Sequence, residues 1–352
     1  NSPIFSQQYL LFMNRVLLLF LVLCAGVLIS FRYKVFNNLR PISTPDNWPK
    51  TVYNFDENPI TEDGFQLGRE LFYDPSLSRD NTISCASCHL QFTGFTHVDH
   101  NVSHGIEGRK GTRNAPALIN LAWNSSFHWD GGVNNLEVQA INPIQHPSEM
   151  DNTLENVLDY LRESSKYQKL FHAAFGDSLI DSKRMLKAFA QFTTSLVSSN
   201  SKYDQYIRKE VSFSIQEKNG LKIFRKHCSS CHTEPLFNSN KFASNGLLLD
   251  SVFNDLGRYA ITNHPEDSLK FRIPTLRNIE YTFPYMHDGR FRKLKEVIEH
   301  YTEGIQVNSH YLSPELRKKI KLNSNEKKDL VAFLYTLTDK EFLYNARFSF
   351  PR

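Results

Sequence analysis

Two copies of the pattern Cys-x-x-Cys-His constrain this chain more than any other feature. They lie at Cys85–His89 and Cys228–His232 and use four of the five cysteines. Two thiols at this spacing suit covalent attachment to one porphyrin, and the adjacent imidazole can become the proximal iron ligand. We therefore predict two covalent haem c groups, the first held by Cys85, Cys88 and His89 and the second by Cys228, Cys231 and His232.

A zinc site of four cysteines, or a pair of disulfides, is the main alternative for these cysteines. Zinc ligation would not explain why histidine follows the second cysteine in both motifs. Zinc-binding cysteine pairs also lie much closer in sequence than these two motifs do. The haem interpretation is therefore favoured.

The chain is long enough for two domains of ordinary size, with one motif in each half of its 352 residues. The formal net charge is +4, and the propionates of two haems would offset most of it. The basic residues are dispersed without a sustained run, so nothing in the charge favours nucleic-acid binding.

An apolar run, residues 16–31, lies near the N-terminus between Arg15 and Arg32. It predicts a signal or membrane-anchor segment over residues 1–34, and no Ala-x-Ala cleavage site follows it. Cys24 could suggest a lipoprotein, but the bulky Leu23 before it argues against this. Because covalent haem requires export, we expect a periplasmic protein anchored to the cytoplasmic membrane by residues 16–31. Whether the segment is cleaved stays open.

The rest of the chain predicts a mostly α fold with two cytochrome-c-like haem domains in tandem. Residues 35–58 indicate a proline-containing linker, residues 59–205 the first haem domain and residues 206–352 the second. The segments 68–72 and 220–224 resemble each other before the two motifs, which indicates an internal duplication. Further helices are expected over 154–175, 182–197 and 328–337, and Ser214 with Glu217 forms a candidate capping box.

Several further motifs resemble the bacterial di-haem cytochrome c peroxidase family, which includes the methylamine-utilisation di-haem enzyme. They are the stretches 77–89, 113–116 (RNAP), 129–131 (WDG), 274–278 (PTLRN) and 284–289 (PYMHDG). The resemblance extends from about Thr61 to Leu343. It implies that the first haem reacts with hydrogen peroxide, while the second exchanges electrons with a small redox protein such as a cytochrome c or a cupredoxin.

The resemblance also assigns catalytic residues to the first haem. Gln139 and Glu149 match the family's distal pair, and Pro143 matches a residue lining the same pocket. A carboxylate can take a proton from bound peroxide and return it to the departing oxygen, while an amide holds the peroxide in place. Trp129 matches a tryptophan between the two haems that relays electrons.

One calcium ion between the domains is implied in the same way. Asn114, Thr282 and Pro284 match the positions that hold it, and hard oxygen ligands suit calcium. A homodimer is left open as well.

Two positions depart from the usual peroxidase pattern. Ile106 stands where a distal histidine of the first haem is expected, although His100 and His104 are near enough to substitute. Tyr301 stands where a methionine would ligate the second haem, as in the methylamine-utilisation enzyme. An anionic oxygen ligand stabilises ferric iron and lowers the reduction potential, whereas methionine raises it. His300 is one alternative ligand, and Met286 is the nearest methionine, although it falls in the preceding motif.

The predicted function is a di-haem c-type peroxidase that reduces hydrogen peroxide with electrons from a small redox protein. The alternative is a methylamine-utilisation-like oxidase, acting on a protein or small molecule through a high-valent haem state. An electron-transfer cytochrome without catalysis is the third candidate. The pair of Gln139 and Glu149 argues against it, because a pure carrier has no use for proton handling.

Overall fold

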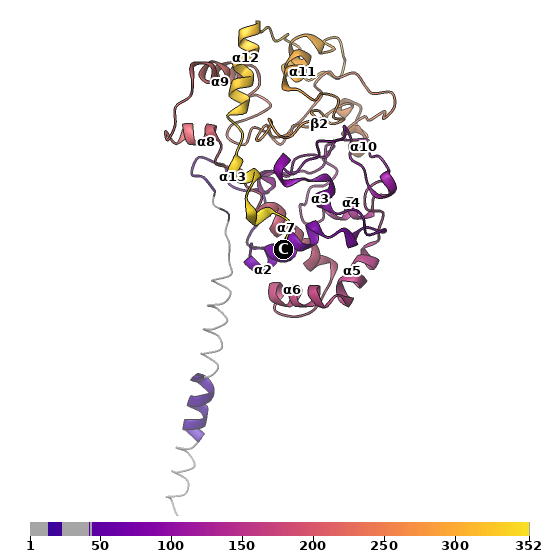
Figure 1. The fold of residues 1–352 in the computed structure, drawn as a ribbon, viewed down its shortest axis with the longest axis vertical. Coiled ribbons are helices and arrows are strands. Elements are labelled where there is room, and N and C mark those ends of the chain that lie inside the picture. The colour runs from indigo at the N-terminus through magenta and orange to yellow at the C-terminus, as the bar shows by residue number, and fades with distance from the viewer. Residues whose placement is uncertain (1–12, 23–41, 43, 352) are drawn as a thin grey trace, which may run out of the picture.

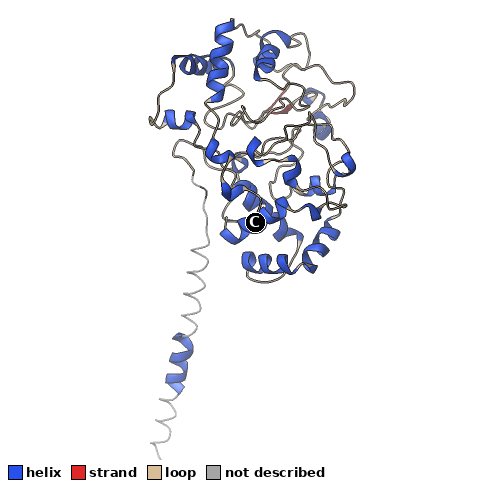
Figure 2. Ribbon diagram, viewed as in Figure 1, coloured by secondary structure: helices blue, strands red, loops and turns tan. Residues whose placement is uncertain are grey.

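The computed structural model describes residues 13–22, 42 and 44–351, which form a two-lobed helical body (Figure 1). Helices and connecting loops make up almost all of it, as Figure 2 shows. The strands β1 (Phe242–Ala243) and β2 (Phe271–Arg272) form one short antiparallel pair in which Phe242 lies opposite Arg272. The predicted mostly α cytochrome c architecture is confirmed.

The first lobe is built from α2 to α7. These are α2 (Glu62–Tyr73), α3 (Cys85–Cys88), α4 (Ile141–Gln145), α5 (Leu154–Glu163), α6 (Ser165–Phe175) and α7 (Ser182–Thr194). Helix α2 begins at Thr61, whose hydroxyl accepts the Gly64 amide at 3.0 Å. Its apolar face packs against α6 and α7 and carries the fully buried Phe65 and Leu71.

The second lobe contains α8 to α12. These are α8 (Lys202–Ile207), α9 (Ile215–His227), α10 (Tyr259–Thr262), α11 (Leu294–Glu299), a π-helical turn η6 (His300–Gly304) and α12 (Ser324–Tyr335). The predicted capping box is present at α9. The Glu217 carboxylate accepts the Ser214 amide at 2.7 Å, and the Ser214 hydroxyl accepts the Glu217 amide at 3.2 Å. Short 3-10 turns connect the elements of both lobes: η1 (Pro75–Leu77), η2 (Gln91–Thr93), η3 (Ile106–Gly108), η4 (Leu121–Trp123), η5 (Pro265–Asp267), η7 (Pro314–Leu316) and η8 (Ala346–Phe348).

The two lobes repeat one helix contact, which supports the predicted duplication. A Cβ on Gly68 of α2 would lie 2.0 Å from the carbonyl oxygen of Ala188 in α7. A Cβ on Gly220 of α9 would lie at the same 2.0 Å from the carbonyl oxygen of Asp329 in α12. Each motif thus follows a helix whose glycine lets a second helix approach its backbone closely.

The expected single helix over 154–175 is wrong, because it is divided at Ser164. The Ser164 backbone is extended there, and its N–H donates to the Tyr160 carbonyl oxygen at the end of α5. Its side chain accepts the Tyr167 amide and so caps the start of α6. Serine favours such a cap over a helix interior.

The expected anchor lies mostly outside the described residues. Residues 13–22 are helical with exposed side chains, while residues 23–31 are not described. Within the described ranges, no helix is both long enough and apolar enough to cross a membrane.

The C-terminal segment returns to the first lobe. Phe342 of α13 (Lys340–Leu343) and Phe348 of η8 belong to the first lobe's apolar core. Arg347 forms an ion pair with Glu62 at 2.8 Å. The domain boundary near residue 205 stays a prediction, and the last residues pack on the first domain whatever the boundary is.

Candidate haem sites

Both motif histidines are oriented by backbone carbonyl groups. His89 Nδ1 lies 2.7 Å from the carbonyl oxygen of Phe95. His232 Nδ1 lies 3.2 Å from the carbonyl oxygen of Phe237 and 3.1 Å from that of Pro274. A proton on Nδ1 satisfies these contacts and leaves Nε2 free as the metal ligand, which is the usual second-shell arrangement of a ligating histidine.

The motif side chains have the protonation expected before haem is attached. Desolvation lowers the pKa of His89 and of His232 to about 4, so both imidazoles are neutral and able to ligate iron. Cys85, Cys88, Cys228 and Cys231 are all free thiols. The disulfide alternative therefore has no support in the structure. Among the described residues, the one group of side chains that could hold a metal ion contains no cysteine. A zinc site made of four cysteines is therefore not supported either.

The second motif opens into a large cavity that suits a haem. Its empty volume is about 1860 Å³, part of it open to solvent, and Cys228, Cys231 and His232 line it. Leu276, Leu294 and other apolar side chains form much of its wall. An apolar cavity beside two free thiols and a neutral imidazole fits a covalently attached porphyrin.

Arg272 is a cavity residue that the sequence analysis missed. It is buried, and its Nε donates to the carbonyl oxygen of His128 at 3.2 Å. Desolvation lowers its pKa to about 10, and no carboxylate among the described residues pairs with it. A buried, unpaired guanidinium in a haem cavity is well suited to hold a propionate. Only its position in β2 brings it there.

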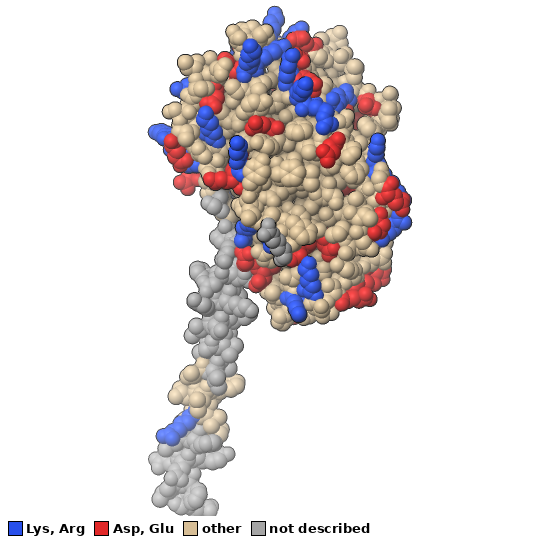
Figure 3. Space-filling model, viewed as in Figure 1, with Lys and Arg blue, Asp and Glu red and all other residues tan. Residues whose placement is uncertain are grey.

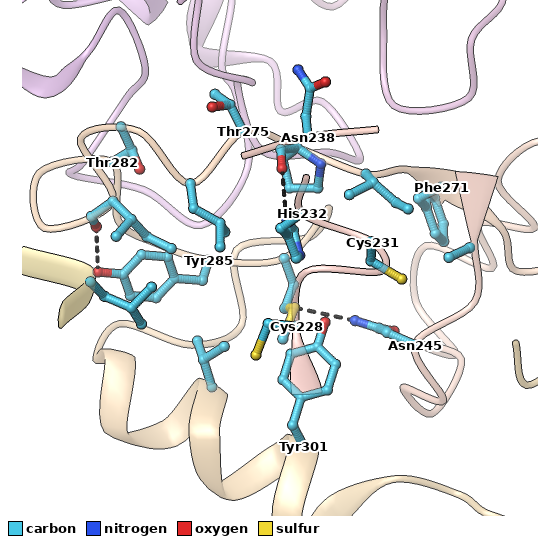
Figure 4. A pocket seen from close by; sticks show the side chains of 18 of the residues that line it. Cys228, Cys231, His232, Asn238, Asn245, Phe271, Thr275, Thr282, Tyr285 and Tyr301 are labelled. Carbon is cyan, nitrogen blue, oxygen red and sulfur yellow. Dashed lines mark hydrogen bonds between the residues drawn. The ribbon is translucent and has the colours of Figure 1, made fainter. Parts of the chain in front are cut away.

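Tyr301 lies in the same cavity, on the π-helical turn η6. Figure 4 shows its ring pointing toward His232 and its hydroxyl beside Cys228 and Asn245. Desolvation raises the pKa of Tyr301 to about 12, although a hydrogen bond with Asn245 lowers it in part. A ferric ion would compensate for the buried phenolate.

The competing ligands are placed differently. His300 is buried outside the cavity lining, and its Nε2 lies 3.0 Å from the carbonyl oxygen of Asn245. Met286 does line the cavity, where its sulfur accepts the Asn245 amide at 3.3 Å. The geometry therefore leaves Tyr301 and Met286 as candidate distal ligands and disfavours His300.

Glu149 lies near the first motif. It follows α4, and its charge raises the pKa values of both Cys85 and Cys88 after the larger effect of burial. Burial in turn raises the pKa of Glu149 above its ordinary value. Gln139 lies just before α4 and Pro143 lies within it, and both side chains are half-buried.

Gly105 is a second residue that the sequence analysis missed. A Cβ at this position would lie 2.2 Å from the Glu149 carbonyl oxygen, and that oxygen accepts the Ile106 amide at 2.8 Å. Close approach of the two loops requires glycine here. Ile106 itself is fully buried, whereas His100 and His104 gather with His97.

The remaining predicted residues belong to the wall of the second-haem cavity. Trp129 is buried and donates its indole N–H to the Asn114 carbonyl oxygen at 2.8 Å. Asn114, Thr282 and Pro284 all line the second-haem cavity, as Trp129 does. All three positions implied for calcium thus belong to the lining of one cavity, and the calcium site stays a prediction.

Comparison with known proteins agrees with this arrangement. Residues 62–212 match the family model of di-haem cytochrome c peroxidase, and residues 217–338 match that of cytochrome c. The methylamine utilization protein MauG of Methylorubrum extorquens is 34% identical and covers 82% of both chains. Cytochrome c551 peroxidase of Nitrosomonas europaea is 33% identical, over 80% of this chain and 81% of its own. The crystal structure of a MauG-like protein associated with microbial copper homeostasis has a TM-score of 0.81 at 34% identity. It covers 88% of this chain and 98% of its own.

Proposed function

The chain belongs to the di-haem cytochrome c peroxidase family, and we propose that it uses hydrogen peroxide to oxidise a redox partner in the manner of the MauG branch. Each turnover would consume one peroxide, two protons and two electrons and release two waters. The electrons would leave the substrate one at a time by way of the second haem. Covalent haem attachment would support a periplasmic location for both domains.

Glu149, near the first motif, would carry out the proton transfers. Its carboxylate would accept a proton from bound peroxide and return it to the departing oxygen, so that this oxygen leaves as water. Gln139 would hold the peroxide through its amide. The haem supplies the redox chemistry when bound, and the two side chains supply proton transfer and orientation.

Tyr301 is the observation that carries the choice of branch. Its phenol group lies in the second-haem cavity facing His232, where the typical peroxidase has methionine. A phenolate stabilises ferric iron and lowers the potential, which makes the haem a poor acceptor from ordinary cytochromes c. The same anionic ligand would stabilise iron in its higher oxidation states, so that the second domain could retain the oxidising equivalents of peroxide for a harder substrate.

Trp129 and the proposed calcium site would link the two haems. The Trp129 indole donates to the carbonyl oxygen of Asn114, and Asn114, Thr282 and Pro284 all line the same cavity. An ion bound to these oxygens would fix the position of Trp129 through Asn114. Trp129 would then relay electrons between the lobes.

Reduction of peroxide by a small cytochrome c is the second candidate function. Peroxidases of this kind share 33% identity with the chain, and Met286 reaches the same cavity as Tyr301. Such a donor would need a second haem of high potential.

The test compares Tyr301→Met with His300→Ala and Met286→Leu in the holoprotein. We expect Tyr301→Met to raise the potential of the second haem, to change its magnetic circular dichroism and to increase peroxide turnover with reduced cytochromes c. The other two variants should keep the native ligation signature. If Met286→Leu removes that signature while Tyr301→Met retains it, the second candidate replaces the first.

A further inference from the structure

Three histidines outside both haem motifs lie together in the loop before η3. Each of His97, His100 and His104 offers one ring nitrogen, and these nitrogens lie within 4.8 Å of one another. The ring centroids are 4.7 to 5.2 Å apart. Along the residues that the structure describes, no other cluster of His, Cys, Asp or Glu has this geometry.

The cluster leaves polar atoms without partners. His97 is 4% exposed, and Nδ1 of both His97 and His104 is buried without a hydrogen bond to any described residue. Leaving such an atom buried without a partner is energetically unfavourable. Two of them in one cluster indicate that something else satisfies them.

Burial favours the neutral, metal-binding form of two of the three imidazoles. Burial, followed by the repulsion of the other histidines, lowers the pKa values of His97 and His104. His100 and His104 also line a cavity with an empty volume of about 1150 Å³, part of it open to solvent. Asp99, Asp250 and Asp288 line it together with Lys110 and Arg290. An ion can therefore reach the cluster from solvent, and its charge would meet more carboxylates than cations.

We propose that His97, His100 and His104 bind one divalent transition-metal ion, Cu²⁺ or Zn²⁺, with an open coordination position toward this cavity. Three imidazoles without a carboxylate suit these ions and do not suit Ca²⁺ or Mg²⁺. Under equal availability Cu²⁺ binds such a set more tightly than Zn²⁺. The site is independent of the proposed peroxide chemistry.

Ligation of the first haem by His100 or His104 is the competing use of these residues. The cluster is close to the first motif, since the Cys88 thiol donates to the carbonyl oxygen of His104 at 3.3 Å. In that case the imidazoles would bind haem iron in the protein free of any added metal. The two uses therefore differ in what is seen before and after metal is supplied.

The experiment titrates the chelator-treated di-haem protein with Cu²⁺ and separately with Zn²⁺ by calorimetry. Elemental analysis after gel filtration gives the number of ions relative to iron. We expect one added ion per two irons, with nitrogen hyperfine structure in the Cu²⁺ electron paramagnetic resonance spectrum. His100→Ala and His104→Ala should each weaken binding at least about 10-fold. His264→Ala, at an exposed histidine outside the cluster, should bind as the wild type does.

Two results would overturn the proposal. One is the absence of stoichiometric binding, or equal affinity in wild type and His100→Ala. The other is a changed haem ligation spectrum in His100→Ala or His104→Ala before metal is added, which would identify a haem ligand. His100 is exposed, so its replacement leaves no cavity in the core.

Discussion

Replacing Gly220 by alanine should destabilise the second lobe. The new Cβ would lie 2.0 Å from the Asp329 carbonyl oxygen, whereas real Cβ contacts essentially never fall under 3.0 Å. Helices α9 and α12 must therefore separate by about 1 Å, because a backbone carbonyl cannot move aside as a side chain would. This separation loosens the contact of Phe224 with Phe333, whose rings are both fully buried with centroids 5.1 Å apart.

The expected magnitude combines two opposing effects. Overpacking costs about 1–3 kcal/mol, and a backbone clash belongs at the upper end of that range. Alanine in place of glycine favours the helix by about 1 kcal/mol. The net loss is about 2 kcal/mol in the free energy of unfolding, or about 1 M in the urea midpoint.

Urea unfolding followed by helical circular dichroism and by the haem absorption band measures this loss. Lys222→Ala is the matched control, because Lys222 is exposed on the same helix and should change stability by less than about 0.5 kcal/mol. Gly68→Ala should behave like Gly220→Ala, since its Cβ would meet Ala188 at the same distance. Equal midpoints for Gly220→Ala and Lys222→Ala would refute the reasoning.

Three further predictions concern the haems. A pyridine haemochrome assay should give two covalent haems per chain, with the colour retained on the protein after acid-acetone extraction; a value near one would contradict this. Glu149→Gln should slow the reaction with peroxide about 10²-fold without loss of haem, as measured by stopped flow. Because burial raises the pKa of Glu149, and only the ionised form accepts a proton, the wild-type rate should fall as pH falls through a value above the ordinary 4.5. The variant should lack that acid limb, and an unchanged limb would assign it to another group. Removal of calcium by a chelator should slow electron transfer between the haems, and this decrease in rate should be smaller in Trp129→Phe. Equal rates with and without calcium would count against the site at Asn114.

The sequence predicted those features that depend on local pattern. The two motifs, the cap at Ser214 and the repeated glycine segments all follow from residues close together in the chain. Helix α7 was expected over 182–197 and ends at Thr194, and α12 begins at Ser324, before the expected 328. Such ends depend on capping contacts that hydrophobic periodicity does not reveal.

Features made by contacts between distant segments could not be predicted in this way. Arg272 joins the haem cavity through β2 and the carbonyl of His128. Gly105 matters only because the Glu149 backbone approaches it. His97 gave no signal as a lone histidine, and the loop fold is what brings it to His100 and His104. In each case the partner lies on another segment or across a turn.

The return of the C-terminal segment to the first lobe affects how the protein matures. Phe342, Leu343 and Phe348 complete a core that otherwise belongs to the earlier part of the chain, and Tyr73 reaches the Phe348 carbonyl oxygen at 2.7 Å. A chain emerging N-terminus first cannot close this core until its final residues have left the export channel. Both Cys-x-x-Cys-His motifs will by then have been presented to the attachment machinery while the first domain is still open. Haem attachment can thus precede final closure, and we expect truncation at residue 338 to leave a first domain with an exposed apolar face.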